Sequence, residues 1–387
     1  MKRSCKVIGV IAFAVLFNAC GSGTGEGLAI GQAKSALSWP VDAALDYSAV
    51  YQIAPLKSAG VDDAYNVWLL DESDRVGVLR PGDLTPTWFS GLGQAGRGFM
   101  AYTLCGGSAD HAYVGYLAYD LASPGSATPE EKLEGDADFL RLNPDGSVEV
   151  EQHLSIVNSK DPSFDESRSV LTCAKVMRGP VKGDIFFGTN HGVTRVRGTQ
   201  YNDHRHSVWA DSSNTMKIGY NYAVSITQDG DVFLGNEWKI AILGAPPLLE
   251  DWTNYYTNTW KLDTTIYAVG TLEDMDYWRA TAQTVDRRYY VGSLSKGLWE
   301  ITISPRSYSE VKVPNTKSIL ALAATDDGSL FIGTGDQGLW KLNADKTLVK
   351  VDTVPGSKVT QLVYDPTIQP SMLLVVSDGR LYGLRGY

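Results

Sequence analysis

Residues 326–342 read DDGSLFIGTGDQGLWKL, and this stretch decides the fold because similar stretches recur along the chain. Its Asp327-Gly328 pair favours a tight turn, since Gly adopts positive φ readily and Asp hydrogen-bonds to its own backbone. The apolar run Leu330–Thr334 predicts one strand, and Leu339–Leu342 predicts the strand that returns beside it. A unit of this size, repeated many times, determines the architecture of a whole protein.

We count seven such units from residue 55 onward, and they match the stretch at 326–342 to different degrees. The others are 184–196, 230–243, 288–301 and 372–384, with weaker copies at 56–79 and, interrupted by an acidic insertion at 122–137, at 111–142. Further strand-like runs lie between them, and four strands in about 40–50 residues are typical of a propeller blade. No apolar stripe of helical period stands out. The sequence therefore predicts an all-β fold, a seven-bladed β-propeller.

The two ends of the chain bear on how such a ring is completed. The last unit stops after its second strand, near Tyr387, so its blade needs a strand from elsewhere. Tyr47–Ile53 is well placed to provide it, which predicts closure by an N-terminal strand. We also expect the inner strands to carry glycine where blades crowd and large side chains where sheets pack: Gly188, Gly235, Gly292 and Gly333, with Phe186, Phe233, Tyr290 and Phe331.

These repeats resemble those of two-component-regulator sensor propellers and, more loosely, of streptogramin-lyase-like propellers. The matching residues are 327–334 with 338–340, and Gly188-Thr189 with Gly192-Val193. The resemblance runs from about residue 55 to the end and is strongest in the last half. It implies a fold, whereas propellers include sensors, lyases, hydrolases and inert scaffolds, so it does not decide the activity.

The N-terminus has the features of an export signal. A basic start, Lys2 to Lys6, precedes the apolar run Val7–Phe17, which is too short for a permanent membrane span. Residues 16–20, LFNAC, resemble the lipobox of bacterial lipoproteins, which implies cleavage before Cys20 and attachment of lipid, including palmitate, to that cysteine. An ordinary signal peptide with an incidental Cys20 is the alternative. Gly21, in place of Asp, favours the outer membrane by the same resemblance.

This signal divides the chain into three parts. We expect residues 1–19 to be the lipoprotein signal peptide, 20–46 a flexible tether that begins with a Gly/Ser-rich stretch, and 47–387 the propeller domain. The formal net charge of −10 becomes more negative when the basic signal is removed. An acidic surface argues against nucleic acid as a partner. The sequence thus predicts an extracytoplasmic domain that contacts the membrane through its lipid.

The remaining cysteines form a pair. Cys105 and Cys173 would lie in an oxidising compartment, which predicts a disulfide between them. Two separate buried thiols are the alternative, because cysteine is also a small core residue.

The histidines provide the polar candidates for a site. His204 and His206 would face the same side of a strand, a spacing that suits a metal, but no third ligand is evident and a polar loop is the competing interpretation. His191 falls in a predicted turn and is a ligand-binding candidate at the top of the ring. No nucleophile elbow, phosphate loop or zinc-protease helix is visible. We therefore predict no catalytic residues, no metal and no cofactor.

Aromatic residues give a second candidate site. Trp252, Tyr255, Tyr256 and Trp260 alternate with Asn and Thr, a composition that suits sugar stacking or a protein hot spot, although packing between blades would need the same rings.

Our leading hypothesis is a lipid-anchored, extracytoplasmic, non-catalytic binding module for an envelope protein or a glycan. One alternative is an envelope- or glycan-directed enzyme, lyase-like, that uses His191, His204 or His206 at the top of the propeller. A structural subunit of an envelope complex is the other.

Overall fold

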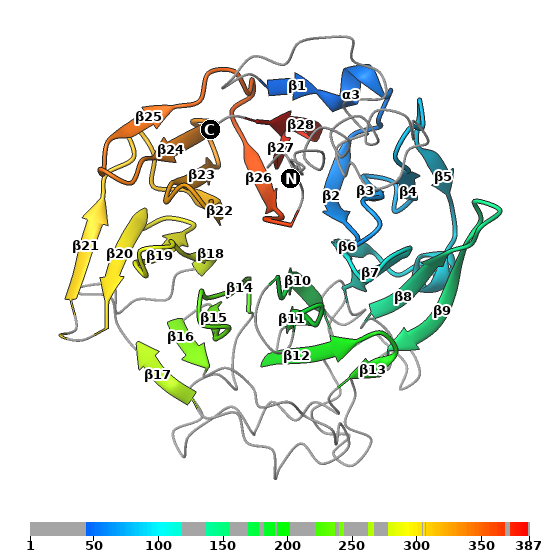
Figure 1. Ribbon diagram of the computed structural model, residues 1–387, viewed down its shortest axis with the longest axis horizontal. Helices are drawn as coiled ribbons and strands as arrows, with labels where there is room; N and C mark the ends of the chain where they lie inside the picture. Colours follow the sequence, from blue (N-terminus) through cyan, green and yellow to red (C-terminus); the bar gives the residue numbers. More distant parts are fainter. Residues whose placement is uncertain are drawn as a thin grey trace, which may run out of the picture.

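The protein folds as an all-β β-propeller. The computed structural model describes residues 44–117, 137–154, 169–177, 182–189, 192–201, 221–236, 240–243, 262–266, 278–303, 305, 307–367 and 372–385. Within these ranges the strands form seven four-stranded antiparallel sheets, which stand around a common centre (Figure 1). The two described helices are short, α3 (Tyr47–Val50) and the 3-10 helix η1 (Gly93–Arg97). No helix in the described ranges has the length and apolarity needed to cross a membrane.

Six sheets consist of four consecutive strands each, ordered from the centre of the ring outward. The first three are β2 (Leu56–Val61), β3 (Val67–Asp71), β4 (Val76–Leu79) and β5 (Thr87–Phe89); β6 (Ala101–Gly106), β7 (His111–Tyr116), β8 (Ala137–Leu142) and β9 (Val148–Leu154); and β10 (Val170–Lys175), β11 (Ile185–Thr189), β12 (Gly192–Arg197) and β13 (Gln200–Tyr201). The next three are β14 (Ala223–Ile226), β15 (Val232–Gly235), β16 (Ile240–Leu243) and β17 (Leu262–Ile266); β18 (Trp278–Gln283), β19 (Tyr289–Ser293), β20 (Leu298–Thr302) and β21 (Ser307–Val311); and β22 (Ile319–Ala324), β23 (Leu330–Thr334), β24 (Leu339–Leu342) and β25 (Leu348–Lys350).

The seventh sheet joins the two ends of the chain. It contains β26 (Val359–Tyr364), β27 (Leu373–Ser377) and β28 (Arg380–Leu384), and its outermost strand is β1 (Ala44–Asp46). The pairing of β1 with β28 is antiparallel, with Ala44 opposite Leu384 and Asp46 opposite Tyr382. An N-terminal segment therefore lies on the last sheet, beside the strand that precedes the C-terminus.

The position expected for this N-terminal strand is wrong. Residues 47–50 form helix α3, and the strand lies just before it, in residues expected to belong to the tether. The local reason is a helix cap: the Asp46 carboxylate accepts a hydrogen bond from the Ala49 N–H at 3.0 Å, and such a cap favours a helical turn over an extended chain. Gln52, with φ of 55°, then ends any extended run before Ile53.

The glycines predicted to lie on inner strands where blades crowd do so, and each lies on the second strand of its sheet. A Cβ at Gly333 in β23 would be 2.7 Å from Val359, and one at Gly235 in β15 would be 2.8 Å from Trp278. Both neighbours belong to the next sheet, so the crowding is between adjacent sheets rather than at the centre of the ring. The large residues expected to pack between sheets, Phe186, Phe233, Tyr290 and Phe331, are all buried.

Candidate functional site

The innermost strands of the seven sheets line two cavities, one near each end of these strands. Their first residues surround a cavity of about 670 Å³, which we call the wide mouth. Their last residues surround a cavity of about 260 Å³, which we call the narrow mouth. In the antiparallel meander, the turns that join the first and second strands of each sheet lie at the narrow mouth. A channel end walled by several elements is a common place for a ligand.

Side-chain bonds join neighbouring innermost strands around this channel. The Gln361 amide of β26 accepts from the Ala59 N–H at 2.8 Å and donates to the Ala59 carbonyl at 3.0 Å, which links the last sheet to the first. Ser58 Oγ of β2 accepts from the Leu104 N–H at 3.1 Å in β6. The channel wall is therefore held by specific polar bonds as well as by apolar packing between sheets.

The predicted disulfide is confirmed and belongs to this wall. Cys105 in β6 and Cys173 in β10 are bonded, with their Cα atoms 6.2 Å apart and a sequence separation of 68. The two strands are the innermost strands of adjacent sheets, which explains how such distant residues meet.

The wide mouth receives residues from all seven sheets. Among the described residues around it, the titratable or aromatic ones are Lys57, Glu72, Tyr102, Tyr222, Arg279 and Lys358. Hydroxyl groups of Ser58, Thr103, Thr172, Ser318 and Thr360 complete its polar lining. Two apolar or aromatic side chains here are exposed to solvent, Met100 by 51% and Tyr102 by 38%. Such exposure beside a cavity is typical of a binding surface.

Three of the four charged side chains that line the wide mouth are cationic. Lys57 is paired with Asp74 at 2.5 Å and also donates to the Ala101 carbonyl. The Arg279 guanidinium lies over the Tyr222 ring, 3.8 Å from its centroid, a cation–π contact. Lys358 is exposed, and its ammonium forms no ion pair with any described residue.

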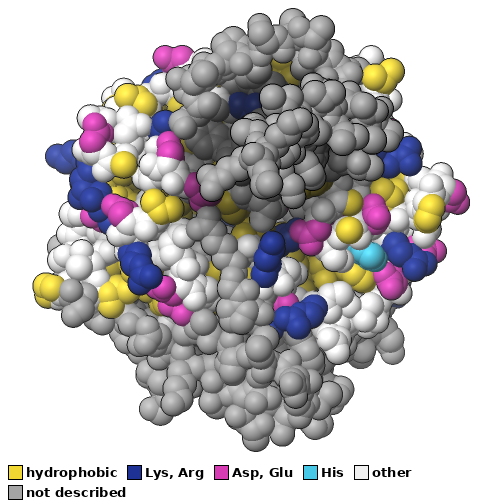
Figure 2. Space-filling view, in the orientation of Figure 1, with side chains coloured by type: hydrophobic (Ala, Val, Ile, Leu, Met, Phe, Trp, Pro, Cys, Tyr) yellow, Lys and Arg dark blue, Asp and Glu magenta, His cyan; other side chains and the backbone are white. Residues whose placement is uncertain are grey.

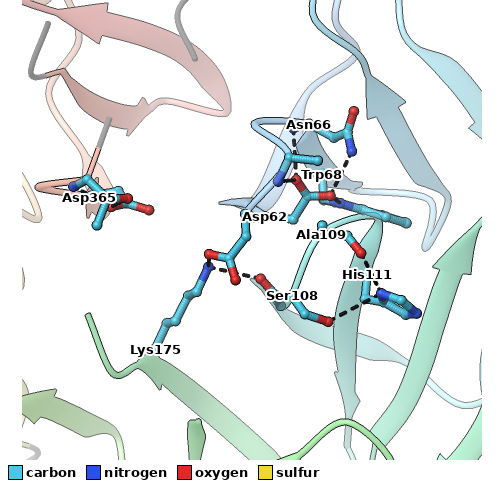
Figure 3. A network of polar contacts seen from close by, with 12 residues as sticks. Asp62, Asn66, Trp68, Ser108, Ala109, His111, Lys175 and Asp365 are labelled. Carbon is cyan, nitrogen blue, oxygen red and sulfur yellow. Dashed lines mark hydrogen bonds and ion pairs between the residues drawn. The ribbon is translucent and has the colours of Figure 1, made fainter. Parts of the chain in front are cut away.

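A polar network whose members are bonded to protein groups lies beside the narrow mouth, and its Lys175 lines that cavity (Figure 3). Lys175, at the end of β10, has only 6% of its side chain exposed and reaches Asp63 Oδ1 at 2.5 Å and the Gly107 carbonyl at 2.9 Å. Its charge is therefore compensated by a carboxylate from the turn after β2. Asp365 lies on the other side of the view and caps its own turn by accepting from Thr367.

Asp62 is a buried member of this network, with 1% of its surface exposed. Its carboxylate accepts hydrogen bonds from the Ala64 and Asn66 N–H groups, from Asn66 Nδ2 and from Trp68 Nε1, at 2.8–3.0 Å. Burial raises the pKa of Asp62, while the bonds from Trp68 and Asn66 act in the opposite direction. With four donors in place, this side chain holds the β2–β3 turn and has little capacity left for a ligand.

His111 is also held by protein groups. Its Nδ1 lies 2.6 Å from the Ala109 carbonyl, its Nε2 lies 3.2 Å from Glu151 Oε2, and its ring stacks on Phe139. Both ring nitrogens thus have partners, and the side chain fixes the β6–β7 turn (Figure 3).

The chain also contains a pair of a buried carboxylate, Asp138, and a partly exposed histidine, His153, that sequence reasoning missed. Asp138 Oδ1 lies 2.8 Å from His153 Nδ1, and Asp138 Oδ2 accepts from the Gln94 N–H at 2.9 Å. Burial, with Asp138 nearby, raises the pKa of Tyr116. The pair could have been found by aligning the two strands of the β8–β9 hairpin, because Asp138 is directly opposite His153 in their pairing. The pair fastens η1 and β9 to β8.

Most of the residues predicted from sequence to form a site lie outside the described ranges. These are Cys20; His191, between β11 and β12; His204 and His206, between β13 and β14; and Trp252, Tyr255, Tyr256 and Trp260, between β16 and β17. Within the described ranges, no group of three or more His, Cys, Asp or Glu side chains is placed to hold a metal ion.

Solved structures of several propellers are similar to this one. Over 88% of this chain and 98% of the other, virginiamycin B lyase from Staphylococcus aureus superposes with a TM-score of 0.53 at 11% sequence identity. A streptogramin B lyase superposes with a TM-score of 0.51 at 12% identity, over 86% of this chain and 93% of the other.

The third comparison is with a sensor. The extracellular domain of a protein described as a hybrid two-component system from B. thetaiotaomicron has a TM-score of 0.56 at 12% identity, over 86% of this chain but only 40% of the other. No protein-family model and no curated protein sequence matches the chain. The expected resemblance to sensor and streptogramin-lyase propellers is therefore confirmed, and at these identities it shows the β-propeller fold alone.

Proposed function

We propose that this chain is an exported, lipid-anchored binding module whose ligand occupies the wide mouth, without chemical conversion of that ligand. The observation that carries the proposal is the cavity of about 670 Å³ to which all seven sheets contribute side chains. Its size is within the range usual for small-molecule and glycan pockets. The narrow mouth is smaller, and its Asp62 and Lys175 are engaged in bonds that hold turns in place.

We further propose that the seven sheets are seven blades of one ring and that β1 closes it. The pairing of β1 with β28 and the Gln361–Ala59 bonds both join the last sheet to parts of the chain near its start. A closed ring leaves no long unpaired inner edge, which favours a stable extracellular domain.

A direct test of the binding function uses the purified mature protein on a glycan array and in cross-linking with envelope proteins. We expect retention of one ligand class, blocked by changes at the wide mouth, with the ligand recovered unaltered. Recovery of a cleaved or eliminated product would favour the glycan-directed enzyme instead. A stoichiometric complex with an envelope protein that still forms when residues of the wide mouth are substituted would favour a structural subunit.

The proposed lipid anchor predicts a change of location. Cys20→Ser should move the protein from the membrane fraction to the soluble extracytoplasmic fraction, because the thiol that would carry the lipid is removed. Cys5→Ser, within the signal, is the matched control and should leave membrane attachment unchanged. Fractionation followed by immunoblotting measures both. A Cys20→Ser protein that stays with the membrane would refute the anchor, and recovery from the inner membrane would refute only the outer-membrane assignment, which Gly21 supports.

A further inference from the structure

We propose that one residue near the start of each innermost strand belongs to a set that recognises the ligand at the wide mouth, and that this set binds a neutral saccharide. This inference rests on the proposed binding function, and it specifies the class of the ligand and the residues that select it.

Six of the seven innermost strands carry a β-bulge at the same place. In β10, the pair Val170–Thr189 is followed by the pair Thr172–Gly188, so Leu171 between them has no partner in the register. The same shift by one residue occurs at the start of β2, β6, β18, β22 and β26. The six extra residues are Lys57, Tyr102, Leu171, Arg279, Leu320 and Thr360.

The seventh innermost strand places a tyrosine at the equivalent position. Ala223 of β14 is opposite Gly235, as Thr172 of β10 is opposite Gly188, and the register of β14 begins there. Tyr222 directly precedes Ala223, so it corresponds to the extra residue of the other six strands. All seven of these residues line the wide mouth, and we call them the crown.

The crown positions differ from the positions next to them in the side chains that they carry. The residue before each bulge is apolar and at most 3% exposed, namely Leu56, Ala101, Val170, Trp278, Ile319 and Val359. The crown itself contains two aromatic, two aliphatic, two basic and one hydroxyl side chain. Packing between sheets repeats around the ring, so it explains the uniform positions but not the varied ones. Because a bulge re-aims a side chain and is common beside binding sites, the varied positions fit a surface that recognises a ligand.

The described charges at the wide mouth are balanced by protein groups, which favours a neutral ligand. Lys57 is paired with Asp74 at 2.5 Å, and Arg279 is engaged in its cation–π contact. Lys358 and Glu72, the other charged residues of the described lining, are opposite in sign. Figure 2 shows Lys and Arg side chains interspersed with Asp and Glu among the described residues of the visible face. No large field of one sign is therefore present there to concentrate a charged ligand.

Rings and hydroxyl groups favour a saccharide among neutral ligands. Tyr102 is 38% exposed, and a tyrosine ring covers the apolar face of a sugar while its hydroxyl stays in water. Thr360 is exposed too, and Thr172 and Ser318 add hydroxyl groups from two other sheets. Hydroxyl groups donate and accept hydrogen bonds, as the hydroxyls of a sugar require. A wholly apolar ligand would instead take water from these groups without replacing its hydrogen bonds, at a cost in free energy.

The experiment is isothermal titration of the purified mature protein with neutral and control probes. The neutral probes are malto-, cello-, xylo-, manno- and galacto-hexaose, and the controls are an oligogalacturonate, which is charged, and 4-nitrophenol, which is a ring without sugar hydroxyls. We expect at least one neutral hexasaccharide to bind, with an affinity that changes less than about twofold with ionic strength because no ion pair is formed. Both controls should bind at least about tenfold more weakly.

Substitutions of Tyr102 test the position of the ligand. Tyr102→Ala should weaken binding of the hexasaccharide by about tenfold or more, whereas Tyr102→Phe keeps the ring and should weaken it less than about threefold. Val285→Ala is the control, because Val285 is 39% exposed but lies in the β18–β19 turn, away from the wide mouth. It should change the affinity less than about twofold. Unfolding curves check that every variant is folded.

A substitution that adds a ring tests whether the crown selects the ligand. Thr360→Tyr should change the ratio of the affinities for the two best-bound hexasaccharides by about fivefold or more, because a new ring contacts them differently. A merely structural effect would weaken both alike and leave that ratio unchanged. Val349→Tyr, at a position on β25 that is 44% exposed and outside the lining, is the matched control and should leave the ratio unchanged.

The possible outcomes separate the ligand class from the binding function. Tight binding of the oligogalacturonate that weakens steeply with salt would overturn the neutral class and leave the binding module intact. Binding of a neutral hexasaccharide that neither Tyr102→Ala nor Thr360→Tyr alters would place the ligand elsewhere and overturn the role of the crown. Binding of no hexasaccharide would overturn the inference, and the glycan array and cross-linking described above would then decide whether the binding function survives.

Discussion

Tyr47→Ala is expected to lower the free energy of unfolding by about 3–5 kcal/mol, the usual cost of removing a fully buried aromatic side chain. Tyr47 is 1% exposed, stacks on Tyr51 at 5.4 Å between ring centroids, and donates from its hydroxyl to Met372 Sδ at 3.1 Å. These contacts attach α3 to the last sheet, so their loss should loosen the N-terminal segment that pairs with β28. Urea unfolding followed by tryptophan fluorescence and far-UV circular dichroism measures the change.

A second substitution tests whether Tyr47 stabilises the protein through its packing against Gly383 of β28. A Cβ at Gly383 in β28 would collide with the Tyr47 ring, so Gly383→Ala should also destabilise the protein. In the double variant the ring is gone and the collision disappears, so the combined loss should be smaller than the sum of the two. Tyr102→Ala, which removes an exposed ring, is the control and should cost less than about 0.5 kcal/mol. Full additivity, or a Tyr47→Ala protein as stable as the parent, would contradict the proposed closure.

Local patterns predicted the strands well, because each blade repeats the same turn and the same short apolar runs. The unit at 326–342 appears as β23 and β24, which pair in the expected order. Its glycine lies where blades crowd, as expected, but alternation and turns do not reveal which neighbour it meets, since that depends on the contact between Gly333 and Val359 of the next sheet. The predicted position of the N-terminal strand was wrong, because the run from Tyr47 to Ile53 has a strand-like composition while Asp46 caps a helix there.

The candidate site could not be predicted from sequence for a geometric reason. Residues of six innermost strands line the wide mouth together with Tyr222, which directly precedes β14, so no continuous motif marks it. Lys57 and Lys358, for example, are far apart in sequence and line the same cavity only because the first and last sheets are neighbours. The disulfide was predictable because oxidised cysteines pair irrespective of fold, and the two residues needed no knowledge of the ring.

Breaking the Cys105–Cys173 bond is expected to cost about 4 kcal/mol of the free energy of unfolding. The bond closes a loop across a separation of 68 residues, and the chain-entropy relation for a loop of that length gives this value for the freedom that the unfolded chain regains. The bond also joins β6 to β10 in the channel wall, where Thr103 lies beside Cys173. Loss of the bond should therefore loosen the lining of both mouths as well as the fold.

Reductant and substitution together isolate the contribution of the bond. Oxidised and reduced parent protein should differ by about 4 kcal/mol in urea unfolding, whereas a Cys105→Ala/Cys173→Ala variant should be unaffected by reductant. The substitutions alone also remove packing, because Cys105 is 9% exposed, so the effect of reductant on the parent is the cleaner measure. Equal stability of the oxidised and reduced parent would show that the sheets hold these two strands together without the bond. Packing between the sheets, and not the disulfide, would then account for the rigidity of the channel wall.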